Sequence, residues 1–247
     1  MTSGRATATV RYGGAPSQYI ELWRPSGDGR RPTAVLIHGG YWRDRYDLHL
    51  MDRLGAQLAQ HGWLAANLEY RRVGPDGGGW PMTFDDVHTG LVTIADLPGA
   101  DDERLVCVGH SAGGHLALLA ATSHPLAATV ALAPVSDLHE ASRRGLSDHA
   151  VHGLLGGPPQ EHPDRYASTD PMRRLPLGVR TLVVHGTDDV NVPIDLSDAY
   201  VEAARAAGDD VTYQRLEGVD HFDVIDASSE AWRGVEAWLA PIATPTD

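Results

Sequence analysis

The sequence predicts an α/β fold in which a mostly parallel central sheet of about eight strands is flanked by helices on both faces. Short apolar runs alternate with helical patterns along most of the chain, as they do where helices connect parallel strands. The middle runs are almost continuously apolar, which is typical of strands buried on both faces. A length of 247 residues suits one large α/β domain, so we expect residues 1–247 to form a single domain.

Each expected strand is a short apolar run, and each expected helix has apolar residues at helical spacing. The strands are expected at 7–12, 18–23, 33–38, 63–70, 104–109, 128–134, 180–185 and 211–216. The helices are expected at 47–61, 81–96, 112–123, 195–207 and 228–239. Only a few residues around Gly13 and Gly14 join the first two strands, so we expect these strands to pair antiparallel at one edge of the sheet.

One segment, residues 137–178, interrupts this alternation. It contains the run GLLGGPPQEHP and many polar residues, and its pattern predicts a single short helix around 143–154. A connection of this length is too long for a simple crossover, and long insertions commonly cover a functional site. We therefore expect residues 137–178 to form a lid or cap.

The charge balance excludes several classes of function. The chain carries 33 acidic and 20 basic residues, for a formal net charge of −13, and every basic residue is arginine. Without lysine the chain has neither a Walker A phosphate loop nor a lysine Schiff base. An acidic chain without a basic run binds nucleic acid poorly, so we expect no nucleic-acid partner.

Other patterns concern membranes, location and cofactors. No window reaches the roughly 18 consecutive apolar residues of a membrane span, and the first residues lack the apolar region of a signal peptide. Cys107 is the only cysteine, which fits a reducing cytoplasm. No strand is followed by G-x-G-x-x-G, and the histidines of residues 137–178 match no usual zinc spacing, so we expect neither a cofactor nor a metal. The sequence leaves a homodimer open.

The strongest local signal is Gly109-His110-Ser111-Ala112-Gly113, a G-x-S-x-G motif between an expected strand and an expected helix. A serine hydroxyl is a weak nucleophile and must be presented on a sharp turn, and the two glycines relieve the crowding that such a turn creates. The N–H groups of the following helix point toward the serine and favour negative charge there. We therefore predict that Ser111 is a nucleophile.

A serine nucleophile needs a general base and an acidic residue that orients the base. His221 follows the last expected strand, and both Asp188 and Asp189 follow the strand before it. Asp137, one strand earlier, is a third candidate for the acid. The chain order Ser, Asp, His is that of α/β-hydrolases, and the carboxyl ends of parallel strands share one edge, where three such side chains can converge.

Four segments resemble the kynurenine formamidase (arylformamidase) branch of the α/β-hydrolases, which is close to the small bacterial carboxylesterases. They are HGGYW at 38–42, GHSAGGHLA at 109–117, HGTDDVNVP at 185–193 and DHF at 220–222. The resemblance extends in order from about residue 18 to about residue 240 and implies an α/β-hydrolase fold. It also implies that Asp189 is the acid and that Asp188 bonds local backbone in a turn.

The same resemblance gives the segment HGGYW a role. Acyl transfer builds an oxyanion, and N–H donors have to stand where that charge develops. By resemblance the donors are the backbone amides of Gly40, Tyr41 and Ala112. Tyr41 and Trp42 are expected to fix the loop and wall the substrate pocket, together with His110. For Trp42, packing beneath the loop is the stronger expectation.

Other polar residues near the site carry simpler expectations. His38 and His185 both end strands, and we expect them to tie neighbouring loops together by hydrogen bonds. A substrate carboxylate would be met by arginine. The sequence does not choose among the arginines near the site, which are Arg43, Arg45, Arg143 and Arg144.

The main functional hypothesis is a serine hydrolase that acts on a small molecule without a cofactor. By resemblance, the substrate is N-formyl-L-kynurenine of tryptophan degradation: Ser111 attacks the formyl carbon, His221 takes its proton, and Asp189 holds the imidazole. A carboxylesterase for short acyl or aryl esters is the alternative, with the same residues. A non-catalytic binding protein of the same fold is a remote alternative, since all three positions are filled.

Overall fold

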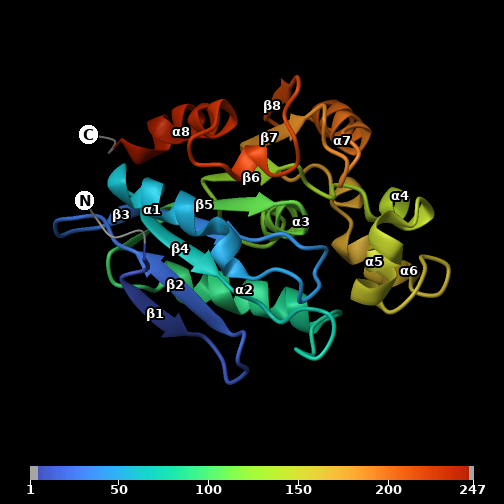
Figure 1. Ribbon diagram of the computed structural model, residues 1–247, viewed down its shortest axis with the longest axis horizontal. Coiled ribbons are helices and arrows are strands. Elements are labelled where there is room, and N and C mark those ends of the chain that lie inside the picture. Colours follow the sequence, from blue (N-terminus) through green and yellow to red (C-terminus); the bar gives the residue numbers. More distant parts are fainter. Residues whose placement is uncertain (1–4, 245–247) are drawn as a thin grey trace.

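The computed structural model describes residues 5–244 and contains one eight-stranded sheet with helices on both faces (Figure 1). The strand order across the sheet is β1-β2-β4-β3-β5-β6-β7-β8. The strands are β1 (Ala8–Arg11), β2 (Tyr19–Trp23), β3 (Arg31–Ile37), β4 (Leu64–Leu68), β5 (Ala100–His110), β6 (Ala128–Leu132), β7 (Thr181–Gly186) and β8 (Val211–Leu216). The predicted α/β fold is confirmed.

The sheet is parallel except at one edge. Strand β1 pairs antiparallel with β2, and β2 pairs antiparallel with β4, whereas every pairing from β4 across to β8 is parallel. The predicted antiparallel edge is therefore confirmed. Because the parallel strands run in the same direction, the loops that follow β3, β5, β6, β7 and β8 emerge at one edge of the sheet.

Two apolar layers cover the two faces of the sheet. Along β3, Ala34 and Leu36 belong to one core cluster and Val35 and Ile37 to the other, because successive side chains of a strand point to opposite faces. Helices α1 (Asp52–Gln60) and α8 (Glu230–Ala243) complete the first cluster. The second is completed by α2 (Met82–Ala95), α3 (Ala112–Ala120) and α7 (Asp195–Ala206).

Several element boundaries differ by a few residues from the sequence-based expectation, and two of these differences have a visible cause. The helix expected at 47–61 begins as a 3-10 helix, η1 (Leu48–Met51), before α1, and the strand expected at 104–109 already begins at Ala100. The early part of β5 is polar, with Asp101 and Arg104 joined by a hydrogen bond of 2.8 Å, so apolar periodicity does not reveal it. Another 3-10 helix, η3 (Asp223–Ile225), precedes α8.

Residues 137–178 hold more helix than expected. They contain α4 (Leu138–Arg143), α5 (Leu146–Leu155), α6 (Pro163–Thr169) and the 3-10 helix η2 (Pro171–Arg173), where the sequence predicted one short helix. These helices lie together at one end of the molecule (Figure 1). The helix expected around 143–154 corresponds to α5, whereas α4, α6 and η2 each span seven residues or fewer, too few to show a clear helical period. Such short helices depend on tertiary packing for their stability.

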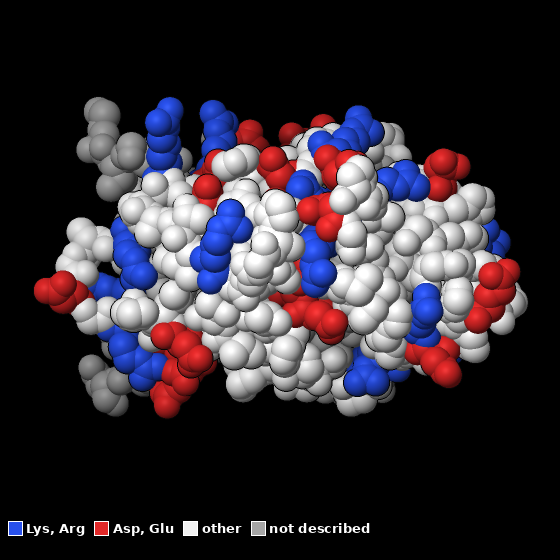
Figure 2. All heavy atoms as spheres, turned by 90° about the horizontal axis from the view of Figure 1, so that it is seen from below, with Lys and Arg blue, Asp and Glu red and all other residues white. Residues whose placement is uncertain are grey.

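The distribution of charge and the length of the helices describe the surface and the helices further. On the face drawn in Figure 2, arginines and carboxylates are interspersed, and no extended basic patch gathers there. Within residues 5–244, no helix combines the length and the apolar character that crossing a membrane requires.

Gly113 lets α3 pack directly against β3, and this contact is testable. A Cβ at Gly113 would lie 2.0 Å from the backbone oxygen of Ile37, so Gly113→Ala must displace the helix or the strand. We expect it to destabilise the fold by about 1–3 kcal/mol and to lower Tm by about 2–12 °C, measured by thermal denaturation.

Gly14→Ala is the matched control for this substitution. A Cβ at Gly14 meets nothing within 4 Å, so Tm should stay within about 2 °C of the wild type. Equal Tm values for the two variants would contradict the close packing of α3 on β3.

Candidate active site

A cavity of about 220 Å³ opens where the loops after β3, β5 and β8 meet. Ser111, His110 and His221 line it, together with Gly40, Tyr41 and Phe222. A larger hollow of about 570 Å³ lies elsewhere, beside α2 and residues 124–127, and holds none of the predicted site residues. The smaller cavity is therefore the candidate active site.

Ser111 stands on a sharp turn between β5 and α3. Its φ of 56° and ψ of −115° are unusual for a residue with a side chain, and it is the N-cap of α3. The glycines on either side make the turn possible: a Cβ at Gly109 would lie 2.0 Å from the Gly113 oxygen. The strand–turn–helix context predicted for G-x-S-x-G is present.

His221 and Asp189 are joined by a short hydrogen bond. The distance from His221 Nδ1 to Asp189 Oδ2 is 2.5 Å, and both side chains are buried. Because Asp189 is an acceptor when ionised, the Nδ1 of His221 carries the proton and its Nε2 is the nitrogen available as a base. Ser111 and His221 face the same cavity.

The environment of Asp189 keeps it ionised. Burial by itself raises the pKa of this carboxyl, but hydrogen bonds from His185 and His221 outweigh it and hold the pKa well below its usual range. The amides of Asn191 and Val192 also donate to Oδ1, each at 2.8 Å. A negative charge therefore persists beside the imidazole of His221 at neutral pH.

Gly186 brings the acid and base loops together. A Cβ at Gly186 would lie 1.9 Å from the backbone oxygen of Val219, so only glycine permits this approach. The neighbouring amide of Asp188 donates to the same Val219 oxygen at 3.1 Å. The loop that follows β8 is thus held directly against the end of β7. The contact is made at Val219, two residues before His221.

The two rival acids lie in other environments. Asp188 is exposed and accepts a hydrogen bond from the hydroxyl of its neighbour Thr187. Asp137 caps the start of α4 by accepting from the amide of Glu140 at 2.8 Å. Of the three candidate acids, Asp189 is the one that the structure places in contact with His221.

The two glycines that follow β3 serve different purposes. A Cβ at Gly39 would lie 2.9 Å from both the His110 oxygen and Ser111 Cβ. Residue 39 must therefore be glycine for the loop to approach the serine turn. Gly40 has a φ of +114°, which residues with a side chain rarely adopt. Among residues 5–244, no group accepts a hydrogen bond from the amides of Gly40, Tyr41 or Ala112, as an oxyanion hole requires.

A buried carboxylate, Glu69, supports this loop, and the sequence analysis did not single it out. Glu69 accepts hydrogen bonds from His38 Nε2 and from the amides of Leu48 and Tyr70, each at 2.9 Å. The signal was present, because Glu69 is the one charged residue in the apolar run at 63–70. The expectation that His38 ties loops by hydrogen bonds is confirmed.

The two aromatic residues of the loop have separate positions. Tyr41 lines the cavity, and its hydroxyl donates to the Asn191 oxygen at 2.6 Å. Burial, followed by the charge of Asp189, raises the pKa of Tyr41 to about 12, so the phenol stays protonated. Trp42 is fully buried, packs edge-on against His115 and does not line the cavity. Its assignment to the pocket wall is wrong, and the expected packing beneath the loop is confirmed.

His110 and His185 hold the base and the acid in place. His110 lines the cavity, and its Nε2 lies 2.9 Å from the backbone oxygen of His221, to which it donates. Burial, followed by the nearby His221, lowers the pKa of His110 to about 3, so it is neutral at physiological pH. His185 contacts Asp189 Oδ2 at 3.0 Å and Ser197 Oγ at 2.7 Å, which confirms its expected loop-tying role.

The structure distinguishes among the four arginines that the sequence offered as partners of a substrate carboxylate. Arg143 and Arg144 pair with Glu140, and Arg144 also pairs with Asp195. Arg43 and Arg45 line the cavity instead. Arg43 reaches the backbone oxygen of Asp148 in α5 at 2.9 Å, which links the loop after β3 to the segment 137–178.

Potential metal ligands gather away from the serine. In the described part of the chain, two groups of carboxylates and a histidine lie close enough to share an ion, and neither includes Ser111, Asp189 or His221. They are Glu21 with His49 and Asp52, and Asp137 with His139 and Asp170.

Solved structures share the fold. The esterase Est2 of Thermogutta terrifontis, with propionate bound, aligns with a TM-score of 0.80 over 99% of this chain and 98% of that chain, at 19% identity. A truncated carbohydrate esterase from gut microbiota aligns with a TM-score of 0.83 over 99% of both chains, at 18% identity. These likenesses confirm the α/β-hydrolase fold.

Curated relatives are longer than this chain. Esterase LipC of Mycobacterium tuberculosis is 28% identical over an alignment of 249 positions, gaps included, that covers 89% of this chain and 60% of LipC. A probable isoprenylcysteine alpha-carbonyl methylesterase of Oryza sativa is 25% identical over 90% of this chain and 58% of its own length. The chain thus spans about 60% of the length of these relatives.

A family model also matches the chain. The model of the BD-FAE family aligns with residues 20–203, a range that includes the segment HGGYW, the serine turn and Asp189. His221 lies beyond the matched range, in a loop that the structure brings back to Asp189. Because the match covers more than half of its residues, the chain belongs to the BD-FAE family.

Proposed function

We propose that the protein is a carboxylesterase that cleaves small esters through an acyl-serine intermediate. The observation that carries this proposal is the short Asp189–His221 hydrogen bond beside a cavity that also holds Ser111. The relatives named as esterases support the reaction class. The three residues also make a non-catalytic binding protein a poor account of the chain.

The proposed reaction uses His221 twice. His221 Nε2 takes the proton of the Ser111 hydroxyl as its oxygen attacks the ester carbon, and Asp189 stabilises the imidazolium that forms. His221 then gives this proton to the departing alcohol oxygen, which leaves the acyl group on Ser111. A water molecule repeats the sequence, so that the acid is released and the serine is restored.

The loop after β3 supplies the electrostatic part of the proposal. An oxyanion forms when the ester carbon becomes tetrahedral, and donors fixed in advance stabilise it without reorganisation. The amides of Gly40, Tyr41 and Ala112 are proposed as these donors. Gly39 allows the close approach, and Glu69 keeps the loop in place through His38 and Leu48.

The size of the cavity and its cover favour a small substrate. A volume of about 220 Å³ is below the range of about 300–1,000 Å³ that is usual for drug-sized ligands. Ser147 of α5 lines the cavity, so residues 137–178 are proposed to act as a cap over the acyl group. A cytoplasmic location and a homodimer both remain predictions.

The esterase proposal replaces formylkynurenine cleavage as the main hypothesis. The same three residues could serve either reaction, so geometry alone does not separate them. The matched relatives are named as esterases, and the kynurenine formamidase branch is not confirmed. The alternative drawn from the sequence therefore fits better.

Replacing the nucleophile tests the reaction class directly. Ser111→Ala should lower kcat/KM for p-nitrophenyl acetate by about 10⁴-fold or more, because the attacking oxygen is lost. It should also abolish labelling by a fluorophosphonate probe. Ser147→Ala, in the same cavity, is the matched control and should keep labelling. A folded Ser111→Ala enzyme with wild-type turnover would refute the proposal.

Replacing the acid tests the assignment within the triad. Asp189→Asn should lower kcat by about 10³-fold or more, since Asn favours the wrong imidazole tautomer and cannot offset its charge. Asp188→Asn and Asp137→Asn are matched controls and should each change kcat less than about tenfold, because neither side chain bonds to His221 in the described structure. If Asp137→Asn proved the crippling change, the acid assignment would be wrong.

The choice of substrate separates the two hydrolase hypotheses. We expect kcat/KM for p-nitrophenyl acetate to exceed that for N-formyl-L-kynurenine by about tenfold or more, because a small cavity excludes the larger amide and activated esters react more readily. Because any serine hydrolase cleaves an activated ester readily, the unactivated ester ethyl butyrate should be measured in the same series. Faster cleavage of N-formyl-L-kynurenine than of both esters would restore the formamidase hypothesis.

A further inference from the structure

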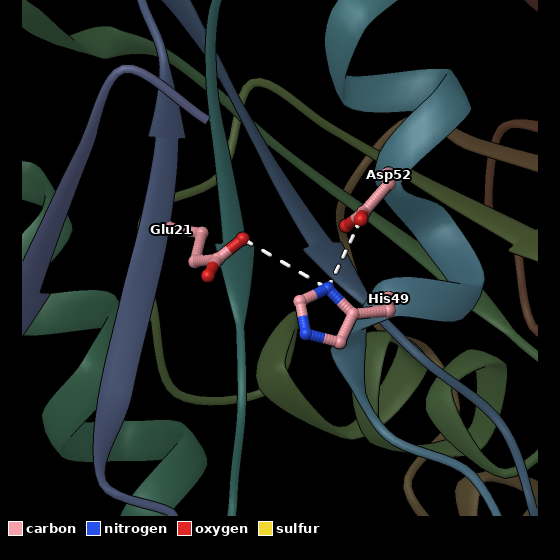
Figure 3. A group of neighbouring side chains, drawn as sticks. All are labelled: Glu21, His49 and Asp52. Atoms are coloured by element: carbon pink, nitrogen blue, oxygen red, sulfur yellow. Dashed lines mark hydrogen bonds and ion pairs between the residues drawn. The ribbon is translucent and has the colours of Figure 1, made fainter. Parts of the chain in front are cut away.

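We propose that Glu21, His49 and Asp52 bind one divalent metal ion of the zinc class. The three residues come from β2, η1 and the first turn of α1, and Figure 3 shows their side chains pointing toward one another. They lie outside the cavity that holds Ser111. Metal binding can therefore be measured without measuring esterase activity.

The separations among these side chains suit a shared ion. Zinc–nitrogen and zinc–oxygen bonds are about 2.0–2.2 Å long, so two ligand atoms on one ion stand no more than about 4.4 Å apart. His49 Nδ1 lies 3.0 Å from Asp52 Oδ2 and 4.0 Å from Glu21 Oε2. All three ligand atoms lie within 4.8 Å of one another, so a small side-chain rotation completes the arrangement.

A buried amide beside these residues points independently to a ligand. Asn67 is fully buried and is the cross-strand partner of Glu21, so both side chains emerge on the same face of the sheet. Its Nδ2 donates to Leu48 O at 2.6 Å and reaches Asp52 Oδ1 at 3.3 Å. Its Oδ1 is buried without a hydrogen-bond partner in the described structure, which costs about 1–3 kcal/mol.

An ion at this place would give the orphaned oxygen a partner. The Oδ1 and Nδ2 of Asn67 belong to one amide group, and that group already touches the Asp52 carboxylate. In the proposed site, a water molecule in the coordination shell of the ion would bond to Oδ1. Coordinating side chains are commonly held by such outer hydrogen bonds.

The local charge also favours a cation. In the described structure, the ion pairs of Glu21 and Asp52 are both made with His49, and no arginine pairs with either carboxylate. The second group of potential ligands differs, because the guanidinium of Arg173 reaches His139 Nδ1 at 3.1 Å. The second set of potential ligands therefore already has a cationic side chain beside it, whereas the carboxylates of Glu21 and Asp52 have no arginine partner in the described structure.

The ligand types select the class of metal. One imidazole and two carboxylates form a mixed nitrogen and oxygen set, which suits Zn²⁺, while Mg²⁺ and Ca²⁺ prefer oxygen alone. Three protein ligands leave the remaining positions to water. Because the side chain of His49 is more than half exposed, a bound ion can exchange with ions in solution.

The position of the ion gives it a mechanical consequence. It would tie β2 to η1, the element that directly follows the loop of Gly40 and Tyr41. Leu50 of η1 lines the active-site cavity, and the Leu48 amide is held by Glu69. The metal would thus brace the far end of the loop proposed to bind the oxyanion.

Isothermal titration of the metal-free protein with ZnCl₂ tests the site. We expect one ion per chain at this site, and Asp52→Asn and Glu21→Gln should each weaken its binding by about tenfold or more. Both changes are nearly isosteric, so the fold should persist. At a free zinc concentration of about 100 times Kd, Tm of the wild type should rise by about 5–11 °C.

His139→Ala is the matched control, because it removes a ligand from the second group and should leave this titration unchanged. Wild-type affinity in both Asp52→Asn and Glu21→Gln would overturn the proposal, as would the absence of zinc binding by the wild type. Loss of binding only in His139→Ala would overturn it too, by moving the site to the second group. Turnover is not the readout, so failure of the esterase proposal would leave the result interpretable.

Discussion

A buried carboxylate costs free energy unless hydrogen bonds satisfy its oxygens, and the whole site is arranged around Asp189, which meets this condition. Its Oδ1 accepts from two consecutive backbone amides, and its Oδ2 accepts from His185 and His221. The four bonds make ionisation tolerable in a buried place. They also fix the imidazole of His221, whose loop is brought within reach by the bare backbone of Gly186. Acid, base and strand end therefore form one unit.

A second buried carboxylate organises the opposite side of the cavity. Glu69, at the end of β4, accepts hydrogen bonds from His38 and from the Leu48 amide, the two ends of the loop that carries Gly40 and Tyr41. One charge thus holds both ends of a loop in which the amides of Gly40 and Tyr41 have no acceptor among residues 5–244. The hydroxyl of Tyr41 crosses to the Asn191 oxygen and connects this loop to the acid loop. The two halves of the site are therefore mechanically coupled.

The sequence predicted those features that depend on local pattern. Apolar runs located all eight strands, and the serine turn followed from glycines at fixed spacing. It could not predict what depends on long-range contact. Glu69 pairs with His38 at the end of a neighbouring strand, and Trp42 packs against His115 of α3. Within residues 137–178, α4 and α6 are too short for a helical period to show. The choice of Asp189 over Asp188 required the family resemblance, because the two stand side by side.

Backbone strain is concentrated at the same place as these contacts. Ser111, Tyr41 and Trp42 all have φ between 51° and 59°, in a region that costs about 1–3 kcal/mol for each residue with a side chain. Backbone hydrogen bonds to neighbouring segments oppose this cost: the Ser111 amide donates to Leu132 O at 2.8 Å, and Val73 N donates to Trp42 O at 2.7 Å. Strain of this kind persists only where the surrounding structure determines it. The buried carboxylates and the glycine contacts supply that determination, so the serine and the free amides can stand in conformations that their own residues disfavour.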